Sequence, residues 1–427
     1  MRLDVDNLGM GRPGSPWWYR LRWVVLAAWT AICFGLCVRP GRPGIDWSTV
    51  NRGAHLLTGG HSAGGLHLYA RDPSIQIGPL TLGAVRFIEL FAGRHAAMAV
   101  ALIGTALLLP ALAGLERAVR FTTDDAHQRA AKLTLIGGLF VVPAWLQATV
   151  VYAHPDDVLV AVFTVGALIA VARRRPALLG LMVALGIAAK PTALVLVPLV
   201  FIFSGRSRAT AASFAALGIA AWLPFVVADR ATLLASHPQT LVQPHSGLSL
   251  FGLAGTPAPT VLRLAQFGLP LVIGWLVVRR GQWAAVPLIG YGLRVAIDPG
   301  DFAYYAVGVL VAALAWQLLR DERQPFTRWA WSIPWAVVAA SIALSVPAGL
   351  GRFIHPHVPS TAQIVLRLVV PLLVVGYAVW VSPDRGRRVP CAAPLAADRQ
   401  RPAHPVPAGP ADGAAALPHA AFVARAE

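Results

Sequence analysis

The sequence has 427 residues, of which 56% are hydrophobic and 13% charged, and its mean hydropathy is +0.62. So few charged side chains cannot cover soluble domains of this total length, which excludes an ordinary soluble protein. The net charge of +17 would suit nucleic-acid binding, but the arginines stand at the ends of apolar runs and form no patch. We therefore predict an integral membrane protein that binds no nucleic acid.

Apolar runs recur along the sequence, and many approach the roughly 20 residues that a helix needs to cross a membrane. We predict an all-α, polytopic fold with about twelve transmembrane helices. The predicted spans are 23–38, 96–115, 133–151, 158–172, two short helices within 177–204, 209–227, 258–278, 283–298, 303–319, 330–348 and 362–381. With both termini in the cytoplasm, nearly every arginine cluster is cytoplasmic, as the positive-inside rule requires.

These spans divide the chain into three parts. We expect a cytoplasmic N-terminus over 1–22, a multi-spanning membrane domain over 23–381 and a cytoplasmic tail over 382–427. The tail is rich in proline and alanine and carries charge, so we expect it to be disordered. Arginine far outnumbers lysine and alanine is abundant, which is typical of a GC-rich bacterial genome. The predicted location is the bacterial inner membrane, among its lipids.

The first outer loop, over 39–95, contains one ambiguous segment. Residues 78–93 are apolar, but the segment is short and carries Arg86 and Glu89. Placing both charges in lipid would cost several kcal/mol, so we predict a helix that lies at the membrane interface. If this segment crosses the membrane instead, the sidedness of the following segments is reversed.

Asp46 follows the first predicted span directly, at the boundary between membrane and water. A carboxylate there can deprotonate a sugar hydroxyl or hold a metal ion that faces a lipid phosphate. The alternative is that Asp46 caps an interfacial helix and that Trp47 is an ordinary aromatic anchor. Position alone leaves both roles open.

A histidine and two acidic residues stand together before a later span, as His154-Pro155-Asp156-Asp157. Adjacent carboxylates beside a histidine can bind a divalent cation or position a sugar. The alternative is that they cap the helix that begins here, where its dipole stabilises negative charge. The one cofactor that these residues could hold is a divalent cation, Mg²⁺ or Mn²⁺, with Asp46 or Asp156 as the candidate ligand.

Lys190 is one of only two lysines, and it lies within the apolar stretch 177–204, directly before Pro191. The proline, and the arginines at both ends of the stretch, predict two short helices that meet at Lys190. An ionisable side chain within the membrane indicates function, and an ammonium near the outer leaflet suits a lipid phosphate. The alternative is a lysine that extends its amine to the headgroups.

Arg294 lies late in a predicted span, and Asp298, Asp301, Tyr304 and Tyr305 follow it. This cluster is typical of the rim of a site, although an internal ion pair explains it equally well. No nucleotide-binding or hydrolase motif such as GxGxxG, GxxxxGK[ST], HExxH or GxSxG occurs in a suitable context. This argues against nucleotide-driven chemistry within the membrane, so any donor substrate would have to arrive in lipid.

Three features together resemble the GT-C superfold of glycosyltransferases that use polyprenyl-phosphate sugars. They are Asp46-Trp47 after the first span, the segment from Leu68-Tyr69 to Gln76-Ile77-Gly78-Pro79-Leu80, and His154-Pro155-Asp156-Asp157 followed by Gly186-Ile187-Ala188-Ala189-Lys190-Pro191. Their order over roughly residues 20–380 is similar to that of bacterial α-mannosyltransferase-type members.

The resemblance implies an inverting transfer of mannose, another hexose or a pentose from polyprenyl phosphate to an envelope glycan or glycolipid at the outer face. It implies that Asp46 is the catalytic base or a metal ligand and that Lys190 engages the lipid phosphate. The residues expected around the substrates are Asp72, Gln76, His154, Asp156, Asp157, Arg294 and Tyr305. The first loop lacks the family's Asp-x-Asp or Glu-Asp pair, which leaves open the metal requirement and whether Asp72 shares the role of Asp46.

Two other functions fit a polytopic membrane protein. A lipid or glycan transporter or flippase favours paired repeats and polar midplane residues on broken helices. Here polar residues concentrate in the outer loops, and only Lys190-Pro191 resembles a broken helix, which favours an enzyme. A non-catalytic membrane scaffold would tolerate changes at Asp46, whereas an enzyme would not.

Overall fold

The computed structural model describes residues 17–39, 41–59, 64–119, 124–235, 241–244, 246–300, 303–319 and 361–380. Most of these residues are helical, and the only β-structure among them is an isolated bridge between Leu241 and Pro257. The all-α prediction is confirmed for this part of the chain. The predicted span 330–348 and the predicted tail lie outside it.

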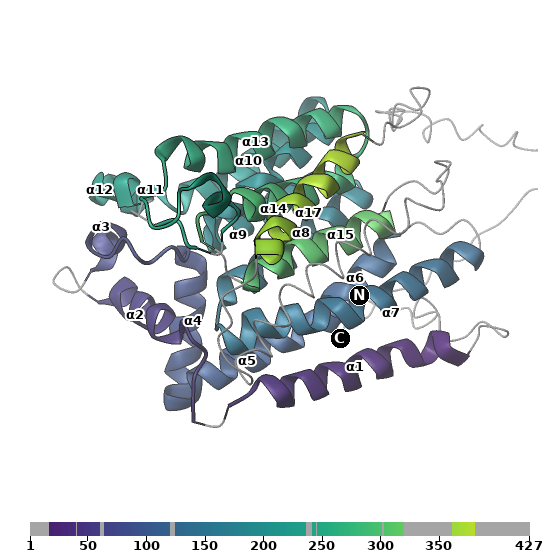
Figure 1. The fold of residues 1–427 in the computed structure, drawn as a ribbon, viewed down its shortest axis with the longest axis horizontal. Coiled ribbons are helices and arrows are strands. Elements are labelled where there is room, and N and C mark those ends of the chain that lie inside the picture. Colours follow the sequence, from purple (N-terminus) through teal and green to yellow (C-terminus); the bar gives the residue numbers. More distant parts are fainter. Residues whose placement is uncertain are drawn as a thin grey trace, which may run out of the picture. The chain divides into compact units, whose positions relative to one another are not determined.

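The helices follow one another along the chain with mostly short connections (Figure 1). The α-helices are α1 (Trp17–Cys37), α2 (Trp47–Thr58), α3 (Leu68–Arg71), α4 (Pro79–Ala92), α5 (Ala96–Ala106), α6 (Leu108–Ala118), α7 (Asp124–Leu146), α8 (Pro155–Ala172), α9 (Pro176–Ala189), α10 (Gly205–Ala220), α11 (Leu223–Ala228), α12 (Ala231–Ala235), α13 (Thr260–Arg279), α14 (Val286–Ile297), α15 (Ala306–Leu319) and α17 (Thr361–Trp380). The short 3₁₀ or π segments are η2 (Gly65–His67), η3 (Gly93–His95), η4 (Gln147–Val151), η5 (Pro191–Ile202), η6 (Gly247–Phe251), η7 (Trp283–Ala285) and η8 (Ala303–Tyr305).

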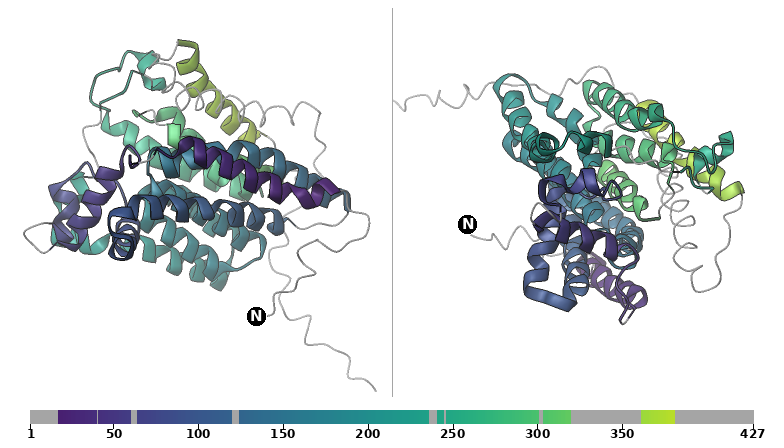
Figure 2. Two further views of the ribbon diagram at one scale, coloured as in Figure 1. Left: turned by 90° about the horizontal axis from the view of Figure 1, so that it is seen from below. Right: turned by 90° about the vertical axis from the view of Figure 1, so that its left-hand side faces the viewer.

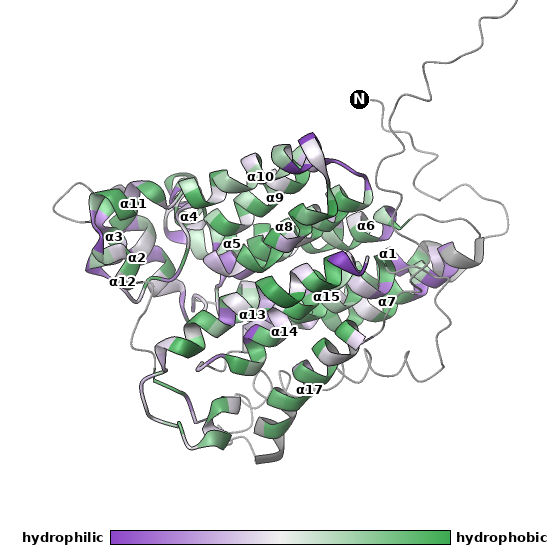
Figure 3. Ribbon diagram, turned by 90° about the horizontal axis from the view of Figure 1, so that it is seen from above, coloured by the Kyte–Doolittle hydropathy of each residue, from purple (hydrophilic) through white to green (hydrophobic). Residues whose placement is uncertain are grey.

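Several of these helices suit a membrane by length and composition, and apolar residues dominate the long ones (Figure 3). Four stretches are long and apolar enough to cross: Pro79–Ala118, His127–Val151, Pro155–Ala172 and Thr260–Arg279. The shorter apolar helices are Leu21–Cys37, Pro176–Ala189, Pro191–Ile202, Trp283–Ile297 and Ala306–Leu319. These findings support a membrane protein, whereas the predicted number of spans stays a prediction.

Helices that are distant in sequence share one large hydrophobic core. Helix α1 packs along α7 (Figure 2), and α8 contacts α6, α9 and α15. Hydrogen bonds from tryptophan indoles to backbone carbonyls also connect these helices. Trp29 of α1 donates to the carbonyl of Leu139 in α7 at 2.9 Å, and Trp145 of α7 donates to the carbonyl of Gly104 in α5 at 2.8 Å.

The predicted first outer loop folds into helices with a core of their own. Val50 of α2, Leu68 of α3 and Leu82 of α4 pack together in this smaller core. Helix α4 coincides with the helix predicted over 78–93, and η3 separates it from α5. Its position at the membrane interface stays a prediction.

The chain breaks at Lys190, as predicted: α9 ends at Ala189 and η5 begins at Pro191. A residue before proline is forced out of the helical region, and Lys190 is extended, with φ −161° and ψ 131°. The N–H of Gly78, before α4, donates to the carbonyl of Ala189 at 2.8 Å. An added Cβ on Gly78 would lie 2.2 Å from the carbonyl oxygen of Ala188, so only glycine permits this contact.

Candidate active site

Asp46 is fixed by backbone pairing with the segment that follows α7. Its N–H donates to the carbonyl of Tyr152 at 3.0 Å, and the N–H of Ile45 donates to the carbonyl of Val151 at 2.9 Å. Asp46 precedes α2 at the N-cap position, but its side chain makes no capping hydrogen bond. The capping role considered from sequence therefore does not account for its carboxylate.

The end of α7 is a widened turn that closes against Gly44. Gln147–Val151 forms a π-helix, and Ala153 then has a φ of +56°, which is uncommon for a residue with a side chain. An added Cβ on Gly44 would lie 2.6 Å from the Cβ of Ala153. Glycine at this position therefore allows the chain before Asp46 to approach the turn that carries His154.

The imidazole of His154 lies between two carboxylates. Its Nε2 is 2.9 Å from Oδ2 of Asp46, and its Nδ1 is 3.2 Å from Oδ1 of Asp156. The ring of Tyr304, in η8, stacks on the imidazole with a centroid distance of 3.8 Å and an interplanar angle of 19°. One histidine thus links the segment after α1 to the start of α8, and an aromatic ring covers one face of the imidazole.

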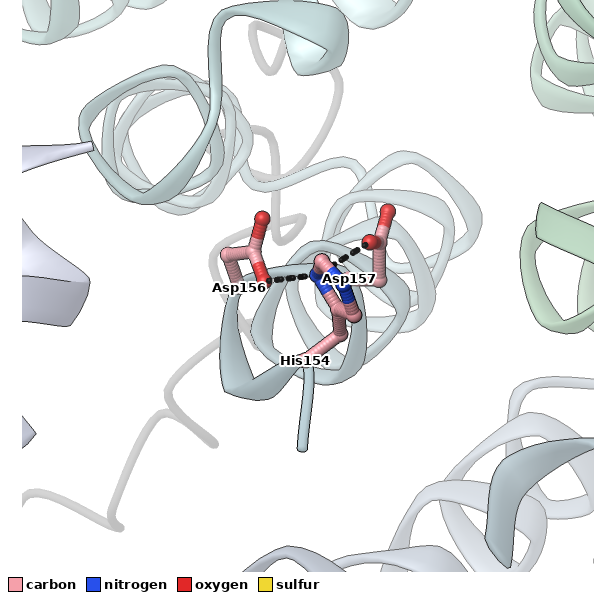
Figure 4. Close-up of side chains that lie close together, drawn as sticks. All are labelled: His154, Asp156 and Asp157. Atoms are coloured by element: carbon pink, nitrogen blue, oxygen red, sulfur yellow. Dashed lines mark hydrogen bonds and ion pairs between the residues drawn. The ribbon is translucent and has the colours of Figure 1, made fainter. Parts of the chain in front are cut away.

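Asp156 and Asp157 lie in the first turn of α8, beside the His154 ring (Figure 4). Nζ of Lys190 is 2.7 Å from Oδ2 of Asp156 and donates a hydrogen bond of 2.6 Å to Oδ2 of Asp157. All three side chains are almost fully buried. Buried charges require partners, so these side chains form a closed ion-pair network. A lysine that extends to the headgroups would not make these contacts.

Arg294, in α14, adds a third cation. Its Nη1 is 3.9 Å from Oδ1 of Asp157, its Nε is 3.7 Å from Oδ2 of Asp298, and its guanidinium lies 4.1 Å from the ring centroid of Tyr305. The internal ion pair considered from sequence is therefore present. The two ion-pair distances are longer than hydrogen bonds. With respect to the described residues, N–H groups of the guanidinium therefore remain available to donate to another anion.

The charges around His154 hold it in its protonated form at neutral pH. Burial lowers its pKa, but the carboxylates of Asp156 and Asp46 raise it by more, to about 9 from an ordinary 6.5. As an imidazolium it can donate to both carboxylates at once. It therefore fixes one oxygen of Asp46 through a charge-assisted hydrogen bond.

Asp46 is the most accessible of the charged residues around His154, with 37% of its side chain exposed. The exposed fraction is 12% for His154 and no more than 13% for Asp156, Asp157, Lys190 and Arg294. His154 contacts only Oδ2 of Asp46. A partly exposed carboxylate that is held through one oxygen can accept a proton from a bound hydroxyl group through the other. The arrangement therefore suits general-base chemistry.

A divalent metal does not fit this cluster, although His154, Asp156 and Asp157 offer ligand atoms within 4.8 Å of one another. Metal binding requires a neutral histidine nitrogen, and both ring nitrogens of His154 face carboxylates. The ammonium of Lys190 lies at the carboxylate oxygens that a cation would need. Asp46 adds a single carboxylate to this set, and we derive no step through a metal.

Two predicted residues have other surroundings. Asp72 pairs with Arg52, with Nε and Oδ2 3.0 Å apart, and Gln76 is exposed between two buried isoleucines. Among the described residues, neither makes a recorded contact with the cluster around His154. Both tyrosines of the predicted rim lie near the charged side chains: Tyr305, the one expected around the substrates, contacts Arg294, whereas Tyr304 stacks on His154.

Comparison with protein families gives one match. The model described as Glycosyltransferase family 87 covers residues 78–301, which is more than half of the chain. The matched region includes His154, Lys190 and Arg294, whereas Asp46 lies before it in the sequence. No curated protein matches the sequence.

Proposed function

The chain belongs to glycosyltransferase family 87, and we propose that it moves a sugar from polyprenyl phosphate to an acceptor at the outer face of the bacterial inner membrane. The acceptor is a hydroxyl group on an envelope glycan or glycolipid. The observation that carries this proposal is the accessible carboxylate of Asp46, held against a buried network of charges. Mannose is the first sugar to test, because the sequence resembles α-mannosyltransferases.

In the proposed reaction Asp46 is the general base. His154 holds Oδ2, and the other oxygen takes the proton of the acceptor hydroxyl. The hydroxyl oxygen attacks the anomeric carbon while the bond from that carbon to the phosphate oxygen breaks. The electron pair of that bond leaves with polyprenyl phosphate, and this single displacement inverts the anomeric configuration.

The departing phosphate needs positive charge, because a site that borders lipid has a low dielectric constant. Arg294 is the better candidate, since its planar fork can bind phosphate through two parallel hydrogen bonds. Its ion pairs of 3.7 and 3.9 Å leave such donors available among the described residues. Lys190, which the sequence suggested, already directs its ammonium at Asp156 and Asp157, so it offers the phosphate its charge and at most one hydrogen bond.

The proposal is tested by the class of donor. The purified protein in lipid nanodiscs receives labelled mannose, another hexose or a pentose, attached either to polyprenyl phosphate or to a nucleotide. We expect label to reach an extracted envelope glycolipid only from a polyprenyl-phosphate donor. Transfer from the nucleotide sugar without added lipid carrier would overturn the proposal, and so would the absence of transfer from every polyprenyl-phosphate donor.

A further inference from the structure

The cluster of His154, Asp156 and Asp157 has the composition of a metal site, yet a lysine lies at its centre. Three ligand atoms converge within 4.8 Å. Nζ of Lys190 lies 2.7 Å from one carboxylate oxygen and 2.6 Å from the other. These distances are those of a cation held between two anions.

The ammonium of Lys190 is fixed in this position. The backbone of Lys190 is extended between α9 and Pro191, which cannot continue the preceding helix. Only 8% of its side chain is exposed. A buried ammonium without its anions would bear a large desolvation cost, so the side chain has no favourable alternative position in lipid.

The charges of the cluster are consistent with a single resident cation. Ion pairs connect these three residues to four further charged side chains, so that the whole network consists of His154, Lys190, Arg294, Asp46, Asp156, Asp157 and Asp298. Three positive and four negative groups leave an excess of one negative charge when all are ionised. Loss of the lysine charge would raise this excess to two, which one divalent ion would balance.

We propose that Lys190 is a built-in cation that takes the place of a divalent metal, so that sugar transfer proceeds without one. Lys190 then acts as a positioning residue: it holds Asp156, which orients His154, which in turn orients Asp46. The claim about transfer rests on the proposed function, whereas the claim about the cation site does not.

Metal binding tests the cation site directly. Purified wild type, Lys190→Ala, Lys190→Arg and Lys132→Ala are titrated with Mn²⁺, and binding is read by electron paramagnetic resonance and by the midpoint temperature of unfolding. Lys132 is the other lysine of the chain, in α7, and serves as the matched control. We expect Lys190→Ala alone to bind Mn²⁺ and to gain midpoint temperature from it, because the truncated side chain leaves space beside Oδ2 of Asp156 and Oδ2 of Asp157, which then lack the ammonium.

The inference that Lys190 occupies a cation site is overturned if the wild type binds Mn²⁺, or if a folded Lys190→Ala protein binds none. A second arm needs no variant: sugar transfer by the wild type is measured after treatment with EDTA. We expect an unchanged rate, and a rate that falls with EDTA and returns with Mn²⁺ or Mg²⁺ would overturn the inference. If the wild type transfers no sugar at all, the proposed function fails, while the Mn²⁺ titration still decides whether Lys190 replaces a metal.

Discussion

His154 connects the accessible Asp46 to the buried charges of the protein. Its two ring nitrogens face Asp46 and Asp156, so its protonation state determines how many hydrogen bonds it can donate. The imidazolium donates to both carboxylates, whereas the neutral ring donates to one. We therefore expect the hold of His154 on Asp46 to weaken when the imidazolium loses its proton.

Replacement of His154 by glutamine tests this dependence. Because the folded pKa of about 9 lies above the ordinary 6.5, the stabilisation from the imidazolium is complete below pH 6.5 and is lost as pH rises through 9. We expect kcat/KM of the wild type to fall through that range, and His154→Gln to be slower but without this alkaline fall. His67→Gln is the control, since His67 pairs with Asp229 instead. The same alkaline fall in His154→Gln would show that another group titrates.

The site residues illustrate what sequence can predict at this scale. A carboxylate at a predicted membrane interface and an ammonium in an apolar stretch are chemically unusual, so the sequence alone points to Asp46 and Lys190. Asp72 lies in the same predicted loop and looks equivalent in sequence, but its ion pair is with Arg52 and not with His154. The pairing of Asp46 with His154 joins residues 108 positions apart, and no local pattern encodes such a contact.

At the level of elements, the turn after α7 is what brings the segment after α1 to the start of α8. The break at Lys190 could be predicted because a proline directly follows it. The π-helix at Gln147–Val151 and the positive φ of Ala153 could not, because these residues have no side chain that requires either conformation. The need for glycine at position 44 follows from this turn alone.

We therefore expect Gly44→Ala to reduce sugar transfer by at least about tenfold, since a small displacement of a catalytic group can cost about a hundredfold in rate. An added methyl group would collide with Ala153 and move Asp46. Transfer and the amount of protein in the membrane are measured together. Gly83→Ala, in α4, is the control, because its added Cβ meets no atom within 4 Å. Equal activity of the two variants would contradict the role of the turn.

For the whole molecule, the contact between Asp46 and His154 constrains the topology. Asp46 follows α1 and His154 follows α7, and their side chains are 2.9 Å apart, so both lie at the same face of the membrane. The chain between them must then cross an even number of times. In the predicted topology the stretch α5–α6 and helix α7 supply two crossings, and a third by α4 would separate the two residues. The contact thus favours α4 at the interface.

Labelling in intact cells tests this topology. With the three native cysteines replaced, single cysteines are introduced at Ser48, in α2, and at Arg173, after α8; both positions are exposed. We expect a membrane-impermeant maleimide to label Ser48→Cys and to reach Arg173→Cys only after the inner membrane is broken. Labelling of both in intact cells would show that α4 crosses the membrane.

The central claim, that Asp46 is the base of a sugar transfer from polyprenyl phosphate, is tested most directly by Asp46→Asn compared with Asp72→Asn. Both variants remove one carboxylate from the predicted first outer loop, but of these two residues only Asp46 contacts His154. With a polyprenyl-phosphate donor and equal amounts of folded protein, we predict a loss of about 10²–10⁴-fold in rate for Asp46→Asn and a near wild-type rate for Asp72→Asn. Wild-type transfer by Asp46→Asn would contradict the account.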